Sequence, residues 1–379
     1  MYLLSVVIPT KNRYEYLKEC LKSLVELGSD KIEIIVQDNT LQNDEIISFI
    51  EALNWKHIKY YHSTAELSQT ENSDLAVCHT TGEYCTYLGD DDALCQSALD
   101  AAEYLKRNHI PACVNDVATY HWPDVVFAHG TKPALSFDNG NCVVRELDPK
   151  KIMDDFLSWG CQDIKFLPRI YHGIIHRSVL EKIKEQTGSY FPGPSPDMAN
   201  AVSALLLIQK YVYISLPLIL SGYSYKSAGG MGLRGAHSGS LSAVRQLPAN
   251  AEAEWSPRIP KVWLGYTVWP ESAEKAFIRM DRAEFIDRIN YHAMYAKIFL
   301  KYPDYRKMVL KQTKGISGFF HFVYECFRFM KRWYGERNDL KSRKASGRQY
   351  IVKENISLLQ ACRIVDECYQ QREKNIGDE

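Results

Sequence analysis

Three consecutive carboxylates, Asp90, Asp91 and Asp92, end an apolar run in the stretch EYCTYLGDDDALC. The run from Tyr84 to Leu88 contains the β-branched, aromatic and apolar types that favour a buried strand, and Gly89 then permits a sharp turn. Ligands of open α/β sheets bind beyond the carboxyl ends of strands, where carboxylate oxygens suit a hard cation such as Mn²⁺ or Mg²⁺. The cluster therefore predicts a divalent cation site, and the alternative is a solvated acidic turn or helix start.

Segments with the hydrophobic periods of strands and of helices alternate in the residues that precede this cluster. Such alternation predicts a mostly parallel α/β sheet flanked by helices, with right-handed crossovers and an active edge at the strand carboxyl ends. Apolar runs predict strands at 4–10, 32–37, 58–62 and 83–88, and helical spacing predicts helices from about 17 to 25, at 44–53 and at 72–81.

The second half of the chain begins with a looser pattern and then becomes regular again. An amphipathic helix is predicted within 193–210 and a strand at 211–224, followed by a glycine-rich stretch at 229–239 that we expect to be mobile. We therefore predict a catalytic domain at 1–245 and a helical C-terminal region at 246–379.

The composition excludes several classes of protein. Forty-six basic residues balance 46 acidic residues in 379, so no global field attracts nucleic acid. Ten cysteines without a CxxC pair indicate reduced thiols and a cytoplasmic protein. The N-terminus lacks the basic segment of a signal peptide, and charged or proline residues interrupt the apolar run at 204–220, so no membrane span is expected.

Three ordered motifs together resemble one known family. SVVIPTKNR at 5–13, IIVQDNT at 34–40 and ENSDLAVCHTTGEYCTYLGDDD at 71–92 are similar to motifs of the family 2 glycosyltransferases, which have a GT-A fold. The resemblance covers about the first 240 residues. It implies an inverting, metal-dependent enzyme that moves a sugar from a nucleotide donor, with UDP expected, to a saccharide or lipid-linked saccharide hydroxyl in bacterial polysaccharide biosynthesis.

The family pattern also implies metal ligands, although Gln37 and Gly89 each stand where the family has an aspartate. The alignment places the metal ligand at Asp91 with Asp90 and Asp92 beside it, whereas a literal D-x-D pattern favours Asp90 and Asp92. His237, in the glycine-rich stretch, is a further candidate that would reach the metal or the diphosphate when its loop closes; the alternative is a surface histidine.

The nucleotide contacts follow from the same resemblance. Asp38 ends the second strand, where the family implies that a carboxylate accepts the uracil imide N–H; the alternative is a turn former that caps local backbone N–H groups. The remaining implied nucleotide-binding residues are Pro9, Thr10, Asn12, Arg13, Asn72 and Asp90.

Asp197 in the stretch PSPDMA is the candidate catalytic base. Attack of a hydroxyl on the anomeric carbon needs a carboxylate to accept its proton, and inverting members carry an aspartate at a corresponding helix start. The alternative is an ordinary helix N-terminus, since Pro-Asp commonly precedes an apolar helix. The spacing of His172 and His176 would suit zinc on a helix, but the residues between them favour a strand.

The segment from Phe319 to Arg348 combines aromatic and basic residues. This pattern suits a helix that lies at an anionic membrane surface, on the inner face of the cell membrane, and it suits equally a helix packed on the main domain.

Two alternative functions of the protein also remain. A sugar nucleotidyltransferase would need a glycine-rich basic loop after the first strand, which IPTKNRYEY does not supply, and a non-catalytic carbohydrate-binding protein would keep the fold without turnover.

Overall fold

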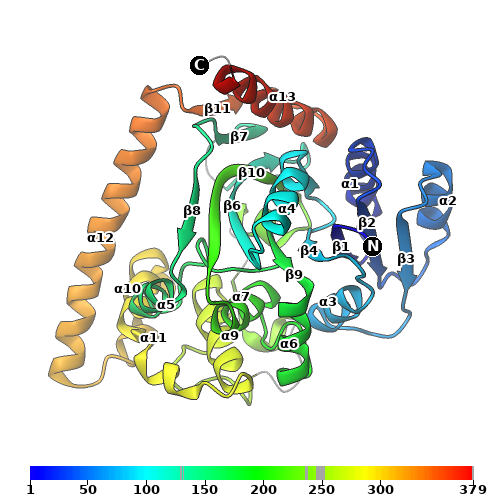
Figure 1. Ribbon diagram of the computed structural model, residues 1–379. Helices are drawn as coiled ribbons and strands as arrows, with labels where there is room; N and C mark the ends of the chain where they lie inside the picture. The colour runs from blue at the N-terminus through cyan, green and yellow to red at the C-terminus, as the bar shows by residue number, and fades with distance from the viewer. Residues whose placement is uncertain (129, 131, 235–237, 245–251, 378–379) are drawn as a thin grey trace.

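The computed structural model describes residues 1–128, 130, 132–234, 238–244 and 252–377, where one mixed sheet is covered by helices on both faces (Figure 1). All the strands of the described residues, 11 in number, belong to this sheet. They are β1 Leu4–Thr10, β2 Ile32–Asp38, β3 Ile58–His62, β4 Tyr84–Tyr87, β5 Ala93–Leu94, β6 Ala112–His121, β7 Leu135–Asp138, β8 Val144–Leu147, β9 Gly173–His176, β10 Tyr211–Tyr223 and β11 Gln349–Val352.

Thirteen α-helices in the described residues surround the sheet. They are α1 Tyr14–Glu26, α2 Asp44–Leu53, α3 Gln69–Cys78, α4 Ser97–Arg107, α5 Pro149–Ser158, α6 Arg177–Thr187, α7 Pro196–Leu207, α8 Ala228–Leu233, α9 Gly265–Arg279, α10 Tyr291–Lys301, α11 Arg306–Leu310, α12 Gly315–Ala345 and α13 Leu358–Gly377. In the described part of the chain, no helix has both the length and the mean hydropathy needed to cross a bilayer.

The N-terminal half is a parallel sheet in the order β3-β2-β1-β4. β1 and β2 are apolar and almost wholly buried, as strands covered on both faces must be. The register pairs Thr10 with Asp38, so the carboxyl ends of these strands meet at one edge. The predicted α/β sheet is thus confirmed, but α3 begins earlier than predicted, because Ser68 and Glu71 form a capping box at its start.

Beyond β4 the sheet is mixed. β9 runs antiparallel between β4 and β6, and β10 runs parallel to β6 and antiparallel to β5. Because β5 follows the aspartate cluster and pairs Ala93 with Leu220, the turn after β10 is brought beside Asp90–Asp92. Long-range pairing, and not sequence proximity, completes this edge of the sheet.

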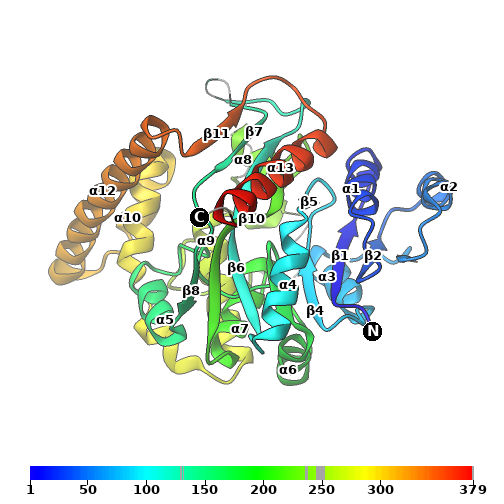
Figure 2. The same ribbon diagram turned by 45° about the horizontal axis from the view of Figure 1, so that its top comes forward.

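The C-terminal region returns to the sheet. β11 pairs with β7, and α13 packs beside α1, where Leu358, Ala361, Cys362 and Val365 join the core of the N-terminal half (Figures 1 and 2). α9 packs on α7, and α12 lies at the outside against α10. The predicted division between 245 and 246 falls among residues outside the described ranges, and it stays a prediction. The glycine-rich stretch includes the short helix α8.

Candidate functional site

The three aspartates lie in the turn after β4, at the carboxyl edge of the parallel strands. Each residue is at most 4% exposed. The alternative of a solvated acidic turn is therefore wrong. Ionised carboxylates buried this deeply need charged or hydrogen-bonding partners.

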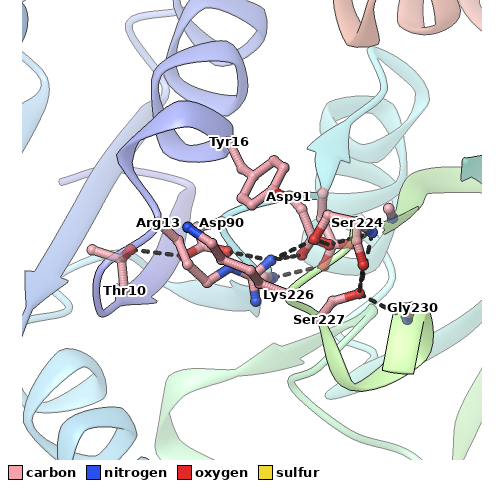
Figure 3. Close-up of polar contacts among 12 residues, drawn as sticks. Thr10, Arg13, Tyr16, Asp90, Asp91, Ser224, Lys226, Ser227 and Gly230 are labelled. Atoms are coloured by element: carbon pink, nitrogen blue, oxygen red, sulfur yellow. Dashed lines mark hydrogen bonds and ion pairs between the residues drawn. The ribbon is translucent and has the colours of Figure 1, made fainter. Parts of the chain in front are cut away.

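Arg13, at the start of α1, is the main partner of the cluster. Its Nη2 lies 3.0 Å from Asp90 Oδ1 and 2.9 Å from Asp91 Oδ1 (Figure 3). The second oxygen of each carboxylate is held separately: Thr10 donates to Asp90 Oδ2 at 2.7 Å, and Ser224 donates to Asp91 Oδ2 at 2.7 Å. Arg13 also donates to the Ser224 hydroxyl at 2.9 Å. One guanidinium thus joins the ends of three chain segments.

The pKa values of these groups reflect burial and crowding. Burial raises the pKa of Asp90 to about 7, with a contribution from Asp91, and Arg13 opposes this rise. Burial and the neighbouring Asp92 likewise raise the pKa of Asp91. Burial alone would lower the pKa of Arg13, but the three aspartates raise it. One positive charge faces a surplus of negative charge, so the site favours a further cation.

Asp92 has a different role from its two neighbours. Its carboxylate accepts hydrogen bonds from the backbone N–H groups of Gly89 at 2.6 Å and Gly222 at 2.7 Å, and it lies 2.7 Å from His172 Nε2. The ring of His172 stacks on Tyr171, with 3.9 Å between centroids. Both oxygens of Asp92 are engaged in joining β4, β10 and the segment before β9, so the geometry does not favour Asp92 as a metal ligand.

The donor set at Asp90 and Asp91 does fit a divalent cation. The Oδ1 atoms of both residues face one point, which the Arg13 Nη2 now occupies. Hard oxygen donors suit Mg²⁺ and Mn²⁺, and such ions are commonly held by one or two carboxylates plus substrate phosphates. Within the described residues no group of three or more His, Cys, Asp or Glu side chains is placed to hold a metal. The candidate ligand His237 lies outside the described residues.

Asp38 is buried at the end of β2 and accepts three hydrogen bonds. Tyr14 and Tyr60 donate their hydroxyls to Oδ2 at 2.6 Å and 2.8 Å, and the Thr40 N–H donates to Oδ1 at 2.8 Å. Burial and this carboxylate raise the pKa of Tyr14 to about 12. The Thr40 hydroxyl in turn accepts the N–H of Asn12, at 2.8 Å. Asp38 therefore orders the loops after β1 and β2, and its carboxylate is fully buried in this structure.

Asn72 on α3 points toward the same two strand ends. Its Nδ2 lies 3.4 Å from the Thr10 carbonyl and 3.5 Å from the Gln37 carbonyl, while its buried Oδ1 has no hydrogen-bond partner among the described residues. A buried amide oxygen without a partner is an unsatisfied acceptor. Pro9 pairs with Gln37 within the sheet and makes no polar side-chain contact with the site.

Asp197 lies in the first turn of α7 and does not contact the aspartate cluster. Its Oδ1 accepts hydrogen bonds from the Ser195 hydroxyl and from the Met198 N–H, the latter at 2.7 Å. Its Oδ2 has no hydrogen bond within the described residues. Tyr171 is partly buried, and burial raises its pKa, which Asp92, Asp91 and Asp197 raise further. Tyr171 therefore lies within the electrostatic reach of both the cluster and Asp197.

The sequence did not identify Ser224, directly after β10, as part of the site. Ser224 binds Asp91 through both its hydroxyl and its N–H, and a Cβ at Gly222 would lie 1.8 Å from the Asp91 carbonyl oxygen. The indole of Trp122 donates to that same carbonyl, at 2.9 Å. The one available signal was that SGYSYKS spans the end of a predicted strand and would emerge at the same edge.

Residues 5–118 match the family model of glycosyl transferase family 2. This segment contains Thr10, Arg13 and the aspartate cluster, and it ends before Asp197 and Ser224. The predicted resemblance to this family is confirmed for that segment.

Two curated bacterial proteins align with about a quarter of the chain. An abequosyltransferase of Salmonella typhimurium is 35% identical over 104 residues, which are 26% of this chain and 30% of the relative. The GalNAc(5)-diNAcBac-PP-undecaprenol beta-1,3-glucosyltransferase of Campylobacter jejuni is 32% identical over 99 residues, which are 25% of this chain and 32% of the relative. The matched stretch thus spans about a third of each relative's length.

A solved structure shows that the similarity of fold extends over the whole chain. TarS 1–349 of S. aureus, solved in complex with UDP-GlcNAc, superposes with a TM-score of 0.50 at 15% identity. The match covers 98% of this chain and 92% of the TarS fragment. At this identity the match establishes a shared fold, in agreement with the predicted GT-A class.

Proposed function

We propose that this protein is a family 2 glycosyltransferase that moves a sugar from a nucleotide donor, with UDP expected, to a hydroxyl of a saccharide or lipid-linked saccharide in bacterial polysaccharide biosynthesis. One observation carries the proposal: the segment that matches the family folds so that Thr10, Arg13, Asp90 and Asp91 converge in a buried, negatively charged site at the carboxyl edge of parallel strands. That edge is where α/β proteins bind nucleotides.

The part of the site that would bind the nucleotide donor needs positive charge, because the donor's phosphates and the carboxylates are both negative. Asp90 Oδ1 and Asp91 Oδ1 would hold Mn²⁺ or Mg²⁺, which would stabilise the charge of the departing nucleoside diphosphate. Thr10 and Ser224 fix the orientation of the two carboxylates through their other oxygens. Arg13 would leave the point between the carboxylates and remain beside the phosphates as a second cation.

The departure from the family pattern at Gly89 is compatible with this role. A Cβ at Gly89 would lie 3.0 Å from Asp91 Oδ1 and 3.1 Å from Asp92 Oδ2. Contacts this short would require the carboxylates to move, so glycine allows their present orientation.

We assign to Asp197 the role of the base that accepts the proton of the acceptor hydroxyl. Ser195 and the Met198 N–H hold one carboxylate oxygen, and Oδ2 stays available to accept the proton of the attacking hydroxyl. In direct displacement, that proton moves to the base as the hydroxyl oxygen bonds to the anomeric carbon and the diphosphate leaves with inversion.

A screen of nucleotide sugars for hydrolysis tests this proposal. UDP-GlcNAc is the first donor to assay, because the S. aureus protein that shares the fold was solved with it. We expect slow release of the nucleoside diphosphate from at least one donor with Mn²⁺, loss of that release with EDTA, and loss in Asp91→Asn. Absence of hydrolysis and of nucleotide binding for every UDP-, GDP- and dTDP-sugar would instead favour a non-catalytic protein.

A further inference from the structure

Helix α12 lies along the outside of the molecule and packs on one side only (Figures 1 and 2). Phe322 and Glu325 are buried on its inner side, and the ring of Phe322 meets Phe299 of α10 edge-on at 5.3 Å. Arg328 lies over the ring of Trp159 at 3.8 Å and donates to the Ser158 carbonyl. The inner side is therefore engaged with the rest of the protein as far as Arg332, whose side chain lies over Trp159 at 4.6 Å.

The opposite side of α12 is a stripe of apolar and aromatic side chains, here called the outer face. Its members recur at helical spacing and each is at least 63% exposed: Ile316, Phe320, Tyr324, Phe327 and Tyr334. The stripe spans about 27 Å at 1.5 Å per residue. Phe319 and Met330, also exposed, widen it. Monomeric soluble proteins rarely expose a continuous apolar surface of this extent, so the outer face needs a partner.

The charge around the outer face indicates which partner it fits. Residues 301–348 contain 13 Lys and Arg against four Asp and Glu, a net charge of +9 in a chain whose net charge is zero. On α12, Arg328, Arg332 and Arg343 form ion pairs, but four exposed basic residues form none among the described residues: Lys331, Arg337, Lys341 and Lys344. The positive charge of this region is thus largely uncompensated.

We propose that the outer face of α12 lies on an anionic lipid surface, with its aromatic side chains in the headgroup region and its free lysines beside lipid phosphates. Aromatic rings and flanking basic residues are the features of helices that lie in a membrane interface. A second copy of this chain is a poorer occupant, because two surfaces of the same positive charge would repel. This inference does not depend on the proposed sugar transfer.

Vesicle flotation of the full chain tests the inference. The probes are vesicles of phosphatidylcholine alone and vesicles with 30–40% phosphatidylglycerol, chosen as roughly physiological anionic content, each at low and high salt. We expect flotation only with the anionic vesicles, and weaker flotation at high salt. Lys331→Gln with Lys341→Gln should weaken partitioning about 25-fold, at about fivefold per charge. The matched control, Lys182→Gln with Lys210→Gln, removes two exposed lysines elsewhere and should change nothing.

The aromatic contribution is tested separately. Phe320→Ser with Phe327→Ser should abolish flotation, whereas Val126→Ser with Ile278→Ser, at exposed sites outside α12, should not. Thermal unfolding checks that each variant is folded, since all four positions are exposed. Wild-type protein that stays unbound with anionic vesicles would overturn the proposal. So would equal flotation of the α12 variants and their controls, or self-association that is lost in the Phe320→Ser and Phe327→Ser variant without any vesicle binding.

Discussion

Replacing Arg13 with glutamine removes the guanidinium that contacts both Asp90 and Asp91. Removing one partner of a buried ion pair typically costs about 3–5 kcal/mol, because the other charge stays buried. Protonation of Asp90 offsets part of this, since its pKa is already about 7 and Arg13 holds it down. We therefore expect the free energy of unfolding to fall by about 3 kcal/mol at neutral pH.

The loss of unfolding free energy in Arg13→Gln should depend on pH in a defined direction. Asp90 has a folded-state pKa above its ordinary value, so the stability linked to its proton is present at low pH and is lost as pH rises through about 7. Without Arg13, the ionised form of Asp90 destabilises the folded protein more. The difference between wild type and Arg13→Gln should therefore be larger at pH 8 than at pH 6, as measured by urea unfolding.

Mn²⁺ should partly replace the missing charge. A cation present at about 100 times its Kd stabilises the folded state by about 2.7 kcal/mol, and the variant gains more than wild type because no guanidinium must first leave. Arg107→Gln, at an exposed site without an ion pair among the described residues, is the control and should change stability by about 0.5 kcal/mol or less. A variant as stable as wild type at both pH values, and unaffected by Mn²⁺, would refute this account of Arg13.

Three further predictions follow from the site and its support. Asp197→Asn should leave donor affinity unchanged while slowing sugar transfer by about 10² to 10⁴-fold, and transfer at the wild-type rate would show that the base lies elsewhere. Calorimetric Mn²⁺ affinity should fall as pH drops below about 7, because Asp90 then takes up a proton; affinity that is constant from pH 5.5 to 7.5 would contradict its role. Glu33→Ala should lower the free energy of unfolding, measured in urea, by about 3–5 kcal/mol, because Lys59, Ser5, Thr81 and Gly82 lose their shared acceptor. The folded variant should still bind the donor, because the proposed donor site lies at the opposite end of the strands.

Local sequence patterns were sufficient to predict the first part of the fold. The strands at 4–10 and 58–62 and the helix at 44–53 have the predicted bounds, because hydrophobic period and element length are local properties. Parallel pairing of β1, β2 and β4 then requires their carboxyl ends to meet, so the convergence of Thr10 with the aspartates could be anticipated. The antiparallel insertion of β9 could not, since strand order depends on tertiary packing.

The roles of single carboxylates were less predictable. Asp91 and Asp92 are adjacent and chemically identical, and they differ because Arg13 and Ser224 reach one while His172 and two backbone N–H groups reach the other. Ser224 is 133 residues from Asp91 along the chain, so no local pattern encodes this contact. The return of α13 to the core of the N-terminal half is likewise a long-range contact.

The central claim is that the buried pair Asp90 and Asp91 forms the cation and nucleotide site, and calorimetric titration of UDP in the presence of Mn²⁺ tests it most directly. Wild type should bind UDP only with the metal, and Asp91→Asn should lose at least tenfold in affinity, about 1.4 kcal/mol, while remaining folded. Asp92→Asn, which weakens the turn through His172, should lose stability while retaining metal-dependent binding wherever it is folded. Equal UDP affinity in wild type and Asp91→Asn, with and without Mn²⁺, would contradict the claim.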